Sequence, residues 1–532
     1  MTTNLTSNNI DATAGSCCDF QASVSRRNAF RIGAGLAGGL AAVSVLGDAF
    51  IETAYAATGK ADRVLVVLSL RGAADGMSLM VPHGDPVYFA ARPSISIPKE
   101  RLIAADDFFG LHPELAPLLP MWEAGSMAAI HATGQRVTTR SHFSAMEEVE
   151  DADPGSSERV GWLNRLLSLN PAGTSLLNGI QLGSTTLATQ SYGPTPVLAT
   201  RGLDAIRVSG PDPNGWLTGM RSLWQDEKNG PVAGGARAFA VADTFAPVIA
   251  SPKGTGYPAG DLGSALAATA RMIRADVGAE VITVDQGSWD HHQNVGNLSG
   301  GNLLTMVKPL GAALAAFFKD LGPLADKVTV VTISEFGRRV KENAGRGLDH
   351  GHGNVMFVLG GGVKGGYYGR WPGIENTDNA DLPVTTDYRD VLAEVVSVLY
   401  PERRLSTVFP GLTPARVGFM HSSTSLEGGG DVLPRQPAGF YRSMGTKRGK
   451  ARVRRRVTAP EPVLSAAGLK AGVAVTYRWE TTAGGKVRKR GSNPSAVVRK
   501  KWKGSDLKVR ITCRAAGYQP LERVVSFGTV RK

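Results

Sequence analysis

Five runs of β-branched and aliphatic residues recur along the first four fifths of the chain. In none of them do apolar and polar positions alternate, a pattern typical of strands buried on both faces of a parallel sheet. These predicted strands are residues 63–70, Met127–Ala132, Val281–Val284, Val328–Ile333 and Val355–Leu359.

Segments between several of these strands carry apolar residues at i, i+3 and i+4 spacing, which predicts amphipathic helices. The predicted helices are Pro113–Glu123, His142–Val149, Leu303–Leu321 and Tyr388–Leu399. Strands separated by helices predict an α/β domain with a mainly parallel sheet, which we assign to residues 57–441. The Gly-, Pro-, Ser- and Thr-rich section from about Pro171 to Gly260 is interpreted as insertions around that sheet.

The pattern changes after residue 441. Residues 442–456 are strongly basic and predict a solvated linker. Residues 457–532 then hold short alternating segments separated by turn residues, which predict a small β-sandwich. The alternating segments are Ala474–Trp479, Ala496–Lys500, Leu507–Cys513 and Val524–Phe527.

Charge divides the chain at the same place. Residues 442–532 hold 24 Lys and Arg against 4 Asp and Glu, a net charge of +20. Residues 1–441 hold 35 against 42, a net charge of −7. Two physically different parts are therefore joined, and the basic one is a candidate for binding an anionic envelope polymer.

The first 56 residues have the three-part pattern of a twin-arginine signal peptide. Arg26 and Arg27 precede a Gly- and Ala-rich apolar stretch, Ile32–Gly47, and Ala54–Ala56 offers a small-x-small cleavage site. The stretch is too short and too rich in glycine for a membrane anchor, which needs roughly 20 apolar residues. The sequence thus predicts export to the periplasm, cell wall or extracellular medium without a transmembrane anchor.

Two other patterns are excluded as functional signals. The glycines at positions 33, 35 and 38 spell GxGxxG, but they follow an arginine pair and not a strand, so a dinucleotide site is rejected. Cys17 and Cys18 precede the arginine pair, so we expect both to be removed with the signal peptide. Cys513 is then the one cysteine of the mature chain, and it cannot form an intramolecular disulfide.

Candidate chemistry gathers where predicted strands end, the edge at which open α/β sheets bind ligands. Carboxylates and imidazoles together at such an edge suit a divalent metal ion, Zn²⁺ or Mn²⁺ by donor type, with Mg²⁺ and Ca²⁺ left open. The candidate metal-binding residues are Asp75, Asp290, His292, Glu335, His350 and His352.

Ser141 and Arg140 directly precede a predicted helix. A helix N-terminus favours an anion, and a serine hydroxyl beside a metal is a plausible nucleophile, so Ser141 is the candidate nucleophile and Arg140 a candidate anion-holding residue. Each residue also has a plainer interpretation. Ser141 can be a helix cap, Asp75 a turn residue, and Arg338 and Arg339 surface charges.

In combination, these motifs resemble a family of exported bacterial proteins called DUF1501, grouped with the alkaline phosphatase and sulfatase superfamily. The resemblance covers roughly residues 20–420. It is carried by RGAADGMSLMVP, FGLHPELAPL, HATGQRVTTRSHFSAMEEVE, GWLNRLL, WDHHQN, TISEFGRRVKENAGRGLDHGHGN, VLGGGVKGGYYGRWPG and TTDYRDVLAEV. It implies an alkaline-phosphatase-like fold with a two-metal site.

The resemblance also implies roles along the sheet. Asp75 resembles the first-strand ligand, Ser141 the nucleophile, and Asp290 with His292 a later ligand pair, while His350 or His352 resembles the last ligand. Glu335 falls where the superfamily commonly has an aspartate. Phe336 departs from the pattern, because a His or Asn ligand is expected there.

The C-terminal segment has its own resemblance, to bacterial immunoglobulin-like repeats, through VTYRWETTAGGKVRKRG and SDLKVRITCRAAGYQPLERVVS. For the whole chain we predict an exported, metal-dependent hydrolase of phosphate or sulfate esters. The alternative is a non-catalytic envelope-binding protein that keeps the phosphatase-like fold. Specific nucleic-acid binding is not predicted, because the basic segment lacks a recognition helix.

Overall fold

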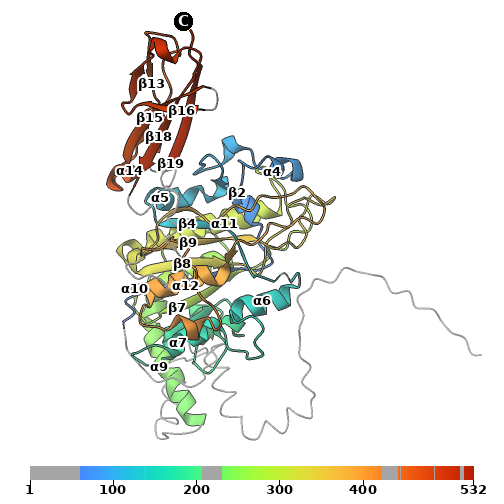
Figure 1. Cartoon of the computed structure of the whole chain (residues 1–532). Coiled ribbons are helices and arrows are strands. Elements are labelled where there is room, and N and C mark those ends of the chain that lie inside the picture. Colours follow the sequence, from blue (N-terminus) through green and yellow to red (C-terminus); the bar gives the residue numbers. More distant parts are fainter. Residues whose placement is uncertain are drawn as a thin grey trace, which may run out of the picture.

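The structure is a computed structural model, and it describes residues 60–532 except 138, 174, 207–230, 422–440, 444, 484–485 and 516–520. A nine-stranded sheet forms the larger domain (Figure 1). From one edge to the other its strands are β10 (Gly366–Tyr368), β4 (Met127–Gly134), β9 (Asn354–Gly360), β8 (Val328–Ile333), β1 (Val64–Leu70), β7 (Val281–Gln286), β5 (Gly179–Leu182) and β6 (Leu198–Thr200), with β11 (Thr386–Asp387) beside β4.

Every strand pair in this sheet is parallel except the two that involve β9. Because β9 alone is reversed, its amino end lies at the edge where β4, β8, β1 and β7 have their carboxyl ends. This edge is called the carboxyl edge below.

Helices cover both faces of the sheet, and alternate residues of β1 show the division. Val66 and Leu68 pack into one core with α10 (Asp261–Arg274) and α11 (Asn302–Leu321). Leu65 and Val67 pack into a second core with two other helices, α7 (Trp162–Ser168) and α12 (Tyr388–Leu399). Burial on both faces explains why the strands show no polar alternation.

Shorter elements complete this domain. They are α3 (Gly76–Leu79), β2 (Met80–Val81), α4 (Pro86–Ala91), β3 (Gly110–Leu111), η2 (Pro113–Leu118), α5 (Leu119–Glu123), α6 (His142–Asp151), α9 (Pro231–Ala250) and α13 (Leu405–Val408), with short 3-10 turns at Lys99–Arg101, Leu176–Asn178, Thr189–Ser191, Leu203–Ala205 and Gly322–Lys327.

The predicted α/β class and mainly parallel sheet are confirmed, and all five predicted strands are present in it. The predicted helix at Pro113–Glu123 is a 3-10 turn, η2, followed by the short helix α5. The section from Pro171 to Gly260 is more than insertions, because it supplies β5 and β6, which extend the sheet beyond β7. These strands have four and three residues, too few to show a period in the sequence.

The C-terminal segment forms antiparallel sheets with a hydrophobic core of its own. Trp479 is fully buried at its centre and donates its indole N–H to the carbonyl oxygen of Asn493 at 2.8 Å. The main sheet runs β16 (Lys486–Gly491), β15 (Ala474–Ala483), β18 (Asp506–Arg514) and β19 (Leu521–Thr529), and the smaller elements are β12 (Tyr441–Ser443), β13 (Arg456–Thr458), β14 (Val463–Leu464), α14 (Ala466–Lys470), β17 (Ser495–Val497) and η8 (Lys500–Trp502). The immunoglobulin-like resemblance stays a prediction.

Residues 442–456 are not a solvated linker over their described length. Ala451 is buried in the C-terminal core, and the backbone N–H of Arg454 donates to the carbonyl oxygen of Val498 at 2.8 Å. The arginines are exposed, but the backbone between them is part of the C-terminal domain. A run of charges in the sequence gave no sign of this, because the small residue that anchors the segment lies among them.

The predicted signal peptide, residues 1–56, lies outside the described residues. Within the described part of the chain, every helix is too short or too polar to cross a membrane.

His112 gives the fold a predictable dependence on pH. Its Nδ1 accepts the backbone N–H of Glu114 at 3.1 Å and so caps η2. Burial lowers the pKa of His112 to about 4. The unfolded chain, with an ordinary histidine, therefore binds a proton between about pH 6.5 and 4 that the folded chain does not.

We expect this group to remove about 1.4 kcal/mol of stability per pH unit as the pH falls through that window. The variant His112→Asn keeps an oxygen acceptor for the cap but does not titrate. Urea unfolding at pH 7, 6, 5 and 4.5 measures the free energy of unfolding of the wild type and of the variant. We expect the wild type to lose stability relative to the variant as the pH falls. A difference that is constant with pH would contradict the prediction.

Candidate metal centre

Three loops at the carboxyl edge bring a group of imidazoles and carboxylates together, and the loop between β8 and β9 supplies two of them. His142 begins α6 after β4, Asp290 follows β7, and Glu335 follows β8. His350 precedes β9, and it reaches the same edge only because β9 is reversed. Residues separated by more than 200 positions in the sequence are thus placed in contact by the sheet topology.

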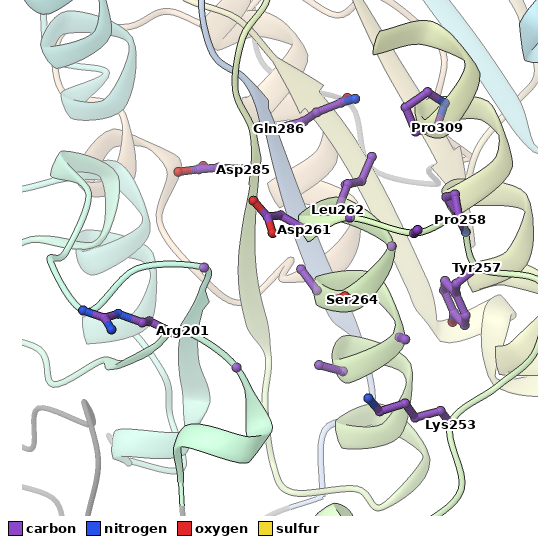
Figure 2. A pocket seen from close by; sticks show the side chains of 18 of the residues that line it. Arg201, Lys253, Tyr257, Pro258, Asp261, Leu262, Ser264, Asp285, Gln286 and Pro309 are labelled. Atoms are coloured by element: carbon purple, nitrogen blue, oxygen red, sulfur yellow. The ribbon is translucent and has the colours of Figure 1, made fainter. Parts of the chain in front are cut away.

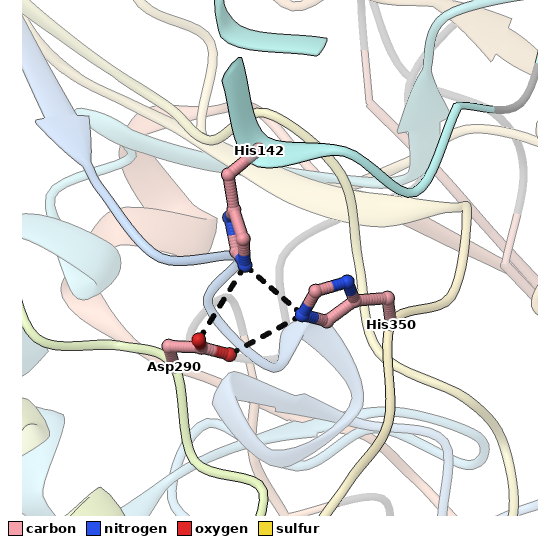
Figure 3. Close-up of side chains that lie close together, drawn as sticks. All are labelled: His142, Asp290 and His350. Atoms are coloured by element: carbon pink, nitrogen blue, oxygen red, sulfur yellow. Dashed lines mark hydrogen bonds and ion pairs between the residues drawn. The ribbon is translucent and has the colours of Figure 1, made fainter. Parts of the chain in front are cut away.

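Three of these side chains present ligand atoms to one another (Figure 3). His142 Nε2 lies 3.0 Å from His350 Nε2 and 3.6 Å from Asp290 Oδ2, and His350 Nε2 lies 3.4 Å from Asp290 Oδ1. Ligand atoms about 2.0–2.1 Å from a tetrahedral zinc ion are separated by about 3.3 Å. The three side chains therefore have the spacing of three ligands of one divalent ion.

His292 lies against this triad. Its Nε2 is 2.9 Å from His350 Nε2 and 3.0 Å from Asp290 Oδ1. It is also more exposed than His142 and His350. His292 therefore adjoins the triad on its solvent side, next to His350 and Asp290.

The other ring nitrogen of each histidine is held by an acceptor. His142 Nδ1 lies 2.7 Å from Glu335 Oε1, His350 Nδ1 lies 2.8 Å from the carbonyl oxygen of Arg140, and His292 Nδ1 lies 3.2 Å from Asp349 Oδ1. A proton on each Nδ1 satisfies these acceptors and leaves the Nε2 lone pairs facing one another. Such outer partners fix the tautomer and ring orientation of metal-binding histidines.

The protonation states have separate causes. The hydrogen bond that His142 donates to the Glu335 carboxylate raises the pKa of His142 against the effect of burial. Burial lowers the pKa of His350, which keeps that imidazole neutral. Burial alone would raise the pKa of Asp290, but the hydrogen bond and charge of Arg338 lower it overall, so Asp290 is a carboxylate.

Arg338 is a buried part of the centre and not a surface charge. Its side chain is 1% exposed, and its Nη2 donates to Asp290 Oδ1 at 2.6 Å. Its other N–H groups donate to backbone carbonyl oxygens of Gly72, Ala73 and Leu348. The guanidinium thus orients Asp290 with one oxygen toward itself and the other toward His142.

Glu335 is close to the centre but acts one step away from it. Its buried carboxylate accepts from His142 and, at 2.8 Å, from the backbone N–H of Gly72, and its second oxygen accepts from Ser334 Oγ at 3.1 Å. With these partners Glu335 orients His142, whereas we expected it to bind the metal directly.

Two predicted ligands lie apart from the triad. Both oxygens of Asp75 are bound by the buried guanidinium of Arg92, at 2.6 and 2.9 Å. His352 Nε2 lies 2.7 Å from the carbonyl oxygen of Gln135. Asp75 neutralises a buried cation, and His352 binds backbone, so the structure gives neither residue to the metal centre.

The predicted nucleophile, Ser141, is exposed at the N-cap position of α6, next to His142 in the chain. Its side chain makes no capping hydrogen bond, so its hydroxyl is not committed to the helix. Arg140 has structural partners, since its Nε donates to the carbonyl oxygen of His350 at 3.1 Å and its guanidinium pairs with Asp381. Ser141 is therefore the more available of the two predicted catalytic residues.

Phe336 forms an apolar wall beside the centre. It is 3% exposed, and its ring centroid lies 4.9 Å from that of His142 and 5.0 Å from that of His350. A phenyl ring in this place gives no ligand, so the residues gathered here suit one ion better than two.

A cleft of about 1100 Å³ opens at the same edge, beyond β5, β6 and β7 (Figure 2). Its polar lining includes Arg201, Lys253, Asp261 and Asp285. Ser288 also lines it and lies two positions before Asp290, a distance that a chain spans in at most about 7 Å. The cleft therefore begins close to the metal centre.

Sequence reasoning missed His142 and Arg338. The sequence places His142 only in a helix, although an imidazole at the first position of a helix that follows a strand is a usable signal. Arg338 offered no such signal, because an arginine pair in a loop is usually solvated.

Comparison with known proteins adds a family match over part of the chain. Residues 250–401 match the family described as "Protein of unknown function (DUF1501)". This segment includes Asp290, His292, Glu335 and His350 but not His142. No curated protein matches the chain.

Two solved structures are similar at a low level. The lipoteichoic acid synthase LtaP from Listeria monocytogenes is 9% identical over 68% of this chain and 77% of its own, with a TM-score of 0.24. The Thermus thermophilus alkaline phosphatase is 13% identical over 60% of this chain and 66% of its own, with a TM-score of 0.23. Likenesses this weak carry no argument, and the predicted alkaline-phosphatase-like fold stays a prediction.

The histidines allow a matched test of metal binding. We expect His350→Ala to weaken Zn²⁺ or Mn²⁺ binding by more than about 100-fold, because even outer partners of metal ligands are worth 10- to 100-fold. His352→Ala removes an imidazole two positions away that lies outside the triad, and it should bind metal as the wild type does.

Titration calorimetry of chelator-treated protein measures the affinities. Thermal melts give a second readout, since a ligand at 100 times its dissociation constant adds roughly 2.7 kcal/mol to the folded state. Equal loss of binding in both variants, or none in either, would contradict the assignment.

Proposed function

We propose that the larger domain is a metal-dependent hydrolase of phosphate or sulfate esters. The observation that carries this proposal is the convergence of the Nε2 atoms of His142, His292 and His350 on the Asp290 carboxylate. With each Nδ1 held by an acceptor, the facing lone pairs and negative charge repel one another unless a cation lies among them.

The donor set fits the group. Imidazole nitrogens with one carboxylate suit Zn²⁺ and also Mn²⁺. When bound, a divalent ion supplies charge neutralisation for the oxygens of an anionic ester and lowers the pKa of a nearby hydroxyl. His142, Asp290 and His350 would hold it, with His292 at the exposed side.

The start of α6 supplies the other half of the argument. Free backbone N–H groups and the helix dipole favour an anion at this end of the ten-residue helix. Ser141 presents an uncommitted hydroxyl there, beside the His142 ligand. An ester anion held between α6 and the triad would have this hydroxyl as its nearest nucleophile.

The reaction is a substitution at phosphorus or sulfur. The Ser141 oxygen forms a bond to the phosphorus or sulfur, and the bond between the phosphorus or sulfur and the alcohol oxygen breaks. The proton of the serine hydroxyl is transferred to the departing alcohol. Water then releases the acid and restores the serine. The cleft beside Ser288 is the place for the organic part of the ester, since its volume of about 1100 Å³ is slightly above the upper end for common ligand pockets, about 1000 Å³.

A second candidate function is a metal-binding envelope protein without turnover. Phe336 favours it, because a phenyl ring stands where a further ligand was expected. Arg140 favours it as well, because its pairing with Asp381 leaves less of its charge for a substrate. Metal bound in full with no hydrolysis of any aryl ester would select this candidate.

The proposal predicts that Ser141→Ala abolishes hydrolysis of aryl phosphates and aryl sulfates. Its stability should equal that of the wild type, because the hydroxyl does not cap α6 and the usual loss of about 1 kcal/mol for a removed cap does not apply. Ser144→Ala is the matched control, an exposed serine three positions along the same helix. Turnover that survives in Ser141→Ala at the wild-type rate would remove Ser141 from the mechanism.

We also propose that the protein is exported by the twin-arginine route, on the basis of Arg26, Arg27 and the Gly-rich stretch that follows. Replacing both arginines by lysine keeps the charge and should leave full-length precursor in the cytoplasm. Cell fractionation followed by immunoblotting measures it, with Lys60→Arg as a charge-conserving control outside the signal. Normal export of the double variant would contradict the route.

A further inference from the structure

One end of the C-terminal domain gathers cations from three separate segments. The segments are residues 450–456, 498–505 and 530–532. The first two are joined by backbone hydrogen bonds, because Arg454 donates to the carbonyl oxygen of Val498 at 2.8 Å and Val498 donates to that of Arg455 at 2.9 Å. They lie side by side although more than 40 residues separate them.

The third segment is tied to both of the others. The backbone N–H of Arg531 donates to the carbonyl oxygen of Ala451 at 2.8 Å, and the N–H of Gly504 donates to that of Val530 at 3.0 Å. Figure 1 shows the C-terminus at the extremity of this domain, at the end where β13 lies. The three segments therefore form one surface, which we call the basic tip.

Eleven side chains of the basic tip are cationic, and all eleven are exposed. They are Lys450, Arg452, Arg454, Arg455, Arg456, Arg499, Lys500, Lys501, Lys503, Arg531 and Lys532. The three segments contain no aspartate or glutamate. Among the described residues, no carboxylate lies within ion-pair distance of any of the eleven.

Two cations of the main sheet differ from those of the tip because they form ion pairs. Arg510 pairs with Glu522 at 2.7 Å, and Arg478 pairs with Glu480 at 2.9 Å. Two of the four carboxylates of the domain thus form ion pairs in its main sheet. Asp506, which adjoins the tip, accepts a hydrogen bond from Thr529 at 2.6 Å and, in the part of the chain that the structure describes, has no ion pair with a cation of the tip. Eleven like charges on one small surface repel one another, and an anionic partner relieves that repulsion.

The shape and composition of the tip limit the classes of anionic partner that it can bind. Its sole aromatic residue, Trp502, is 3% exposed, so no ring is available to stack on a nucleic-acid base. Its helical element, η8, has three residues, too few to enter a DNA groove. The tip is at the extremity of the domain, so the surface of a bilayer can approach it end-on (Figure 1).

We propose that the basic tip binds the surface of a lipid bilayer that contains anionic phospholipids. Juxtamembrane lysines and arginines are attracted to such a surface, and each adds to the partition coefficient. The tip would then hold the C-terminal domain end-on to the membrane. This inference does not rest on hydrolysis by the larger domain.

The test compares two double variants of the full chain that lose equal charge. Lys500→Gln/Lys501→Gln removes two cations of the tip. Lys470→Gln/Arg514→Gln removes two exposed cations from the other end of the main sheet, where Ala474 pairs with Arg514. Sedimentation with phosphatidylcholine vesicles, with and without 30% phosphatidylglycerol, measures the partition coefficients.

We expect wild type and the Lys470/Arg514 variant to bind the anionic vesicles equally and far better than the neutral ones. The Lys500/Lys501 variant should lose about 30-fold in partition coefficient, from two charges near an anionic surface. Binding should also weaken as salt is raised from 0.05 to 0.5 M.

Three outcomes would overturn the proposal. The first is equal binding to neutral and anionic vesicles, and the second is an equal loss of binding in both double variants. The third is competition by a 20-base-pair DNA duplex that prevents vesicle binding when its concentration of phosphate groups is lower than that of the vesicles. Circular dichroism spectra and melting temperatures of both variants show that the domain has stayed folded.

Discussion

The candidate metal centre depends on one buried cation, the guanidinium of Arg338. It binds Asp290, and it also binds the carbonyl oxygens of Gly72, Ala73 and Leu348, so it ties together the loops after β1 and β7 and before β9. A buried charge is tolerated only when it is paired and its N–H groups are satisfied. The loops are therefore held where Arg338 finds all its acceptors, and that arrangement fixes the Asp290 carboxylate toward the histidines.

A second constraint comes from the sheet. Parallel strands present their carboxyl ends at one edge, so β4, β7 and β8 deliver His142, Asp290 and Glu335 there without special loops. His350 comes from the opposite end of a strand, and the reversal of β9 is what brings it to the centre. One antiparallel strand in an otherwise parallel sheet thus adds an imidazole that a purely parallel sheet would place at the far edge.

The sequence predicted the parts of this molecule that depend on local pattern. It missed those that depend on which side chains are brought into contact by the fold. Strands buried on both faces read as unbroken apolar runs, so the sheet was found, whereas β5 and β6 were too short to register. Asp75 and Asp290 both follow a strand, and only the fold shows that Arg92 takes the first while Arg338 and the histidines take the second. Charge segregation was visible in the sequence, but the joining of its segments into one tip was not.

Cys513 sits at 0% exposure in the core of the C-terminal domain and is the one cysteine that the structure describes. Residues 442–532 contain one cysteine, so packing and not a disulfide within the domain holds this domain together. Folding can then be completed in a reducing compartment and kept in an oxidising one, because neither step waits for an oxidant. The reactivity of this thiol also measures opening of the domain, since a reagent in solution can reach the sulfur only when the core around Trp479 has opened.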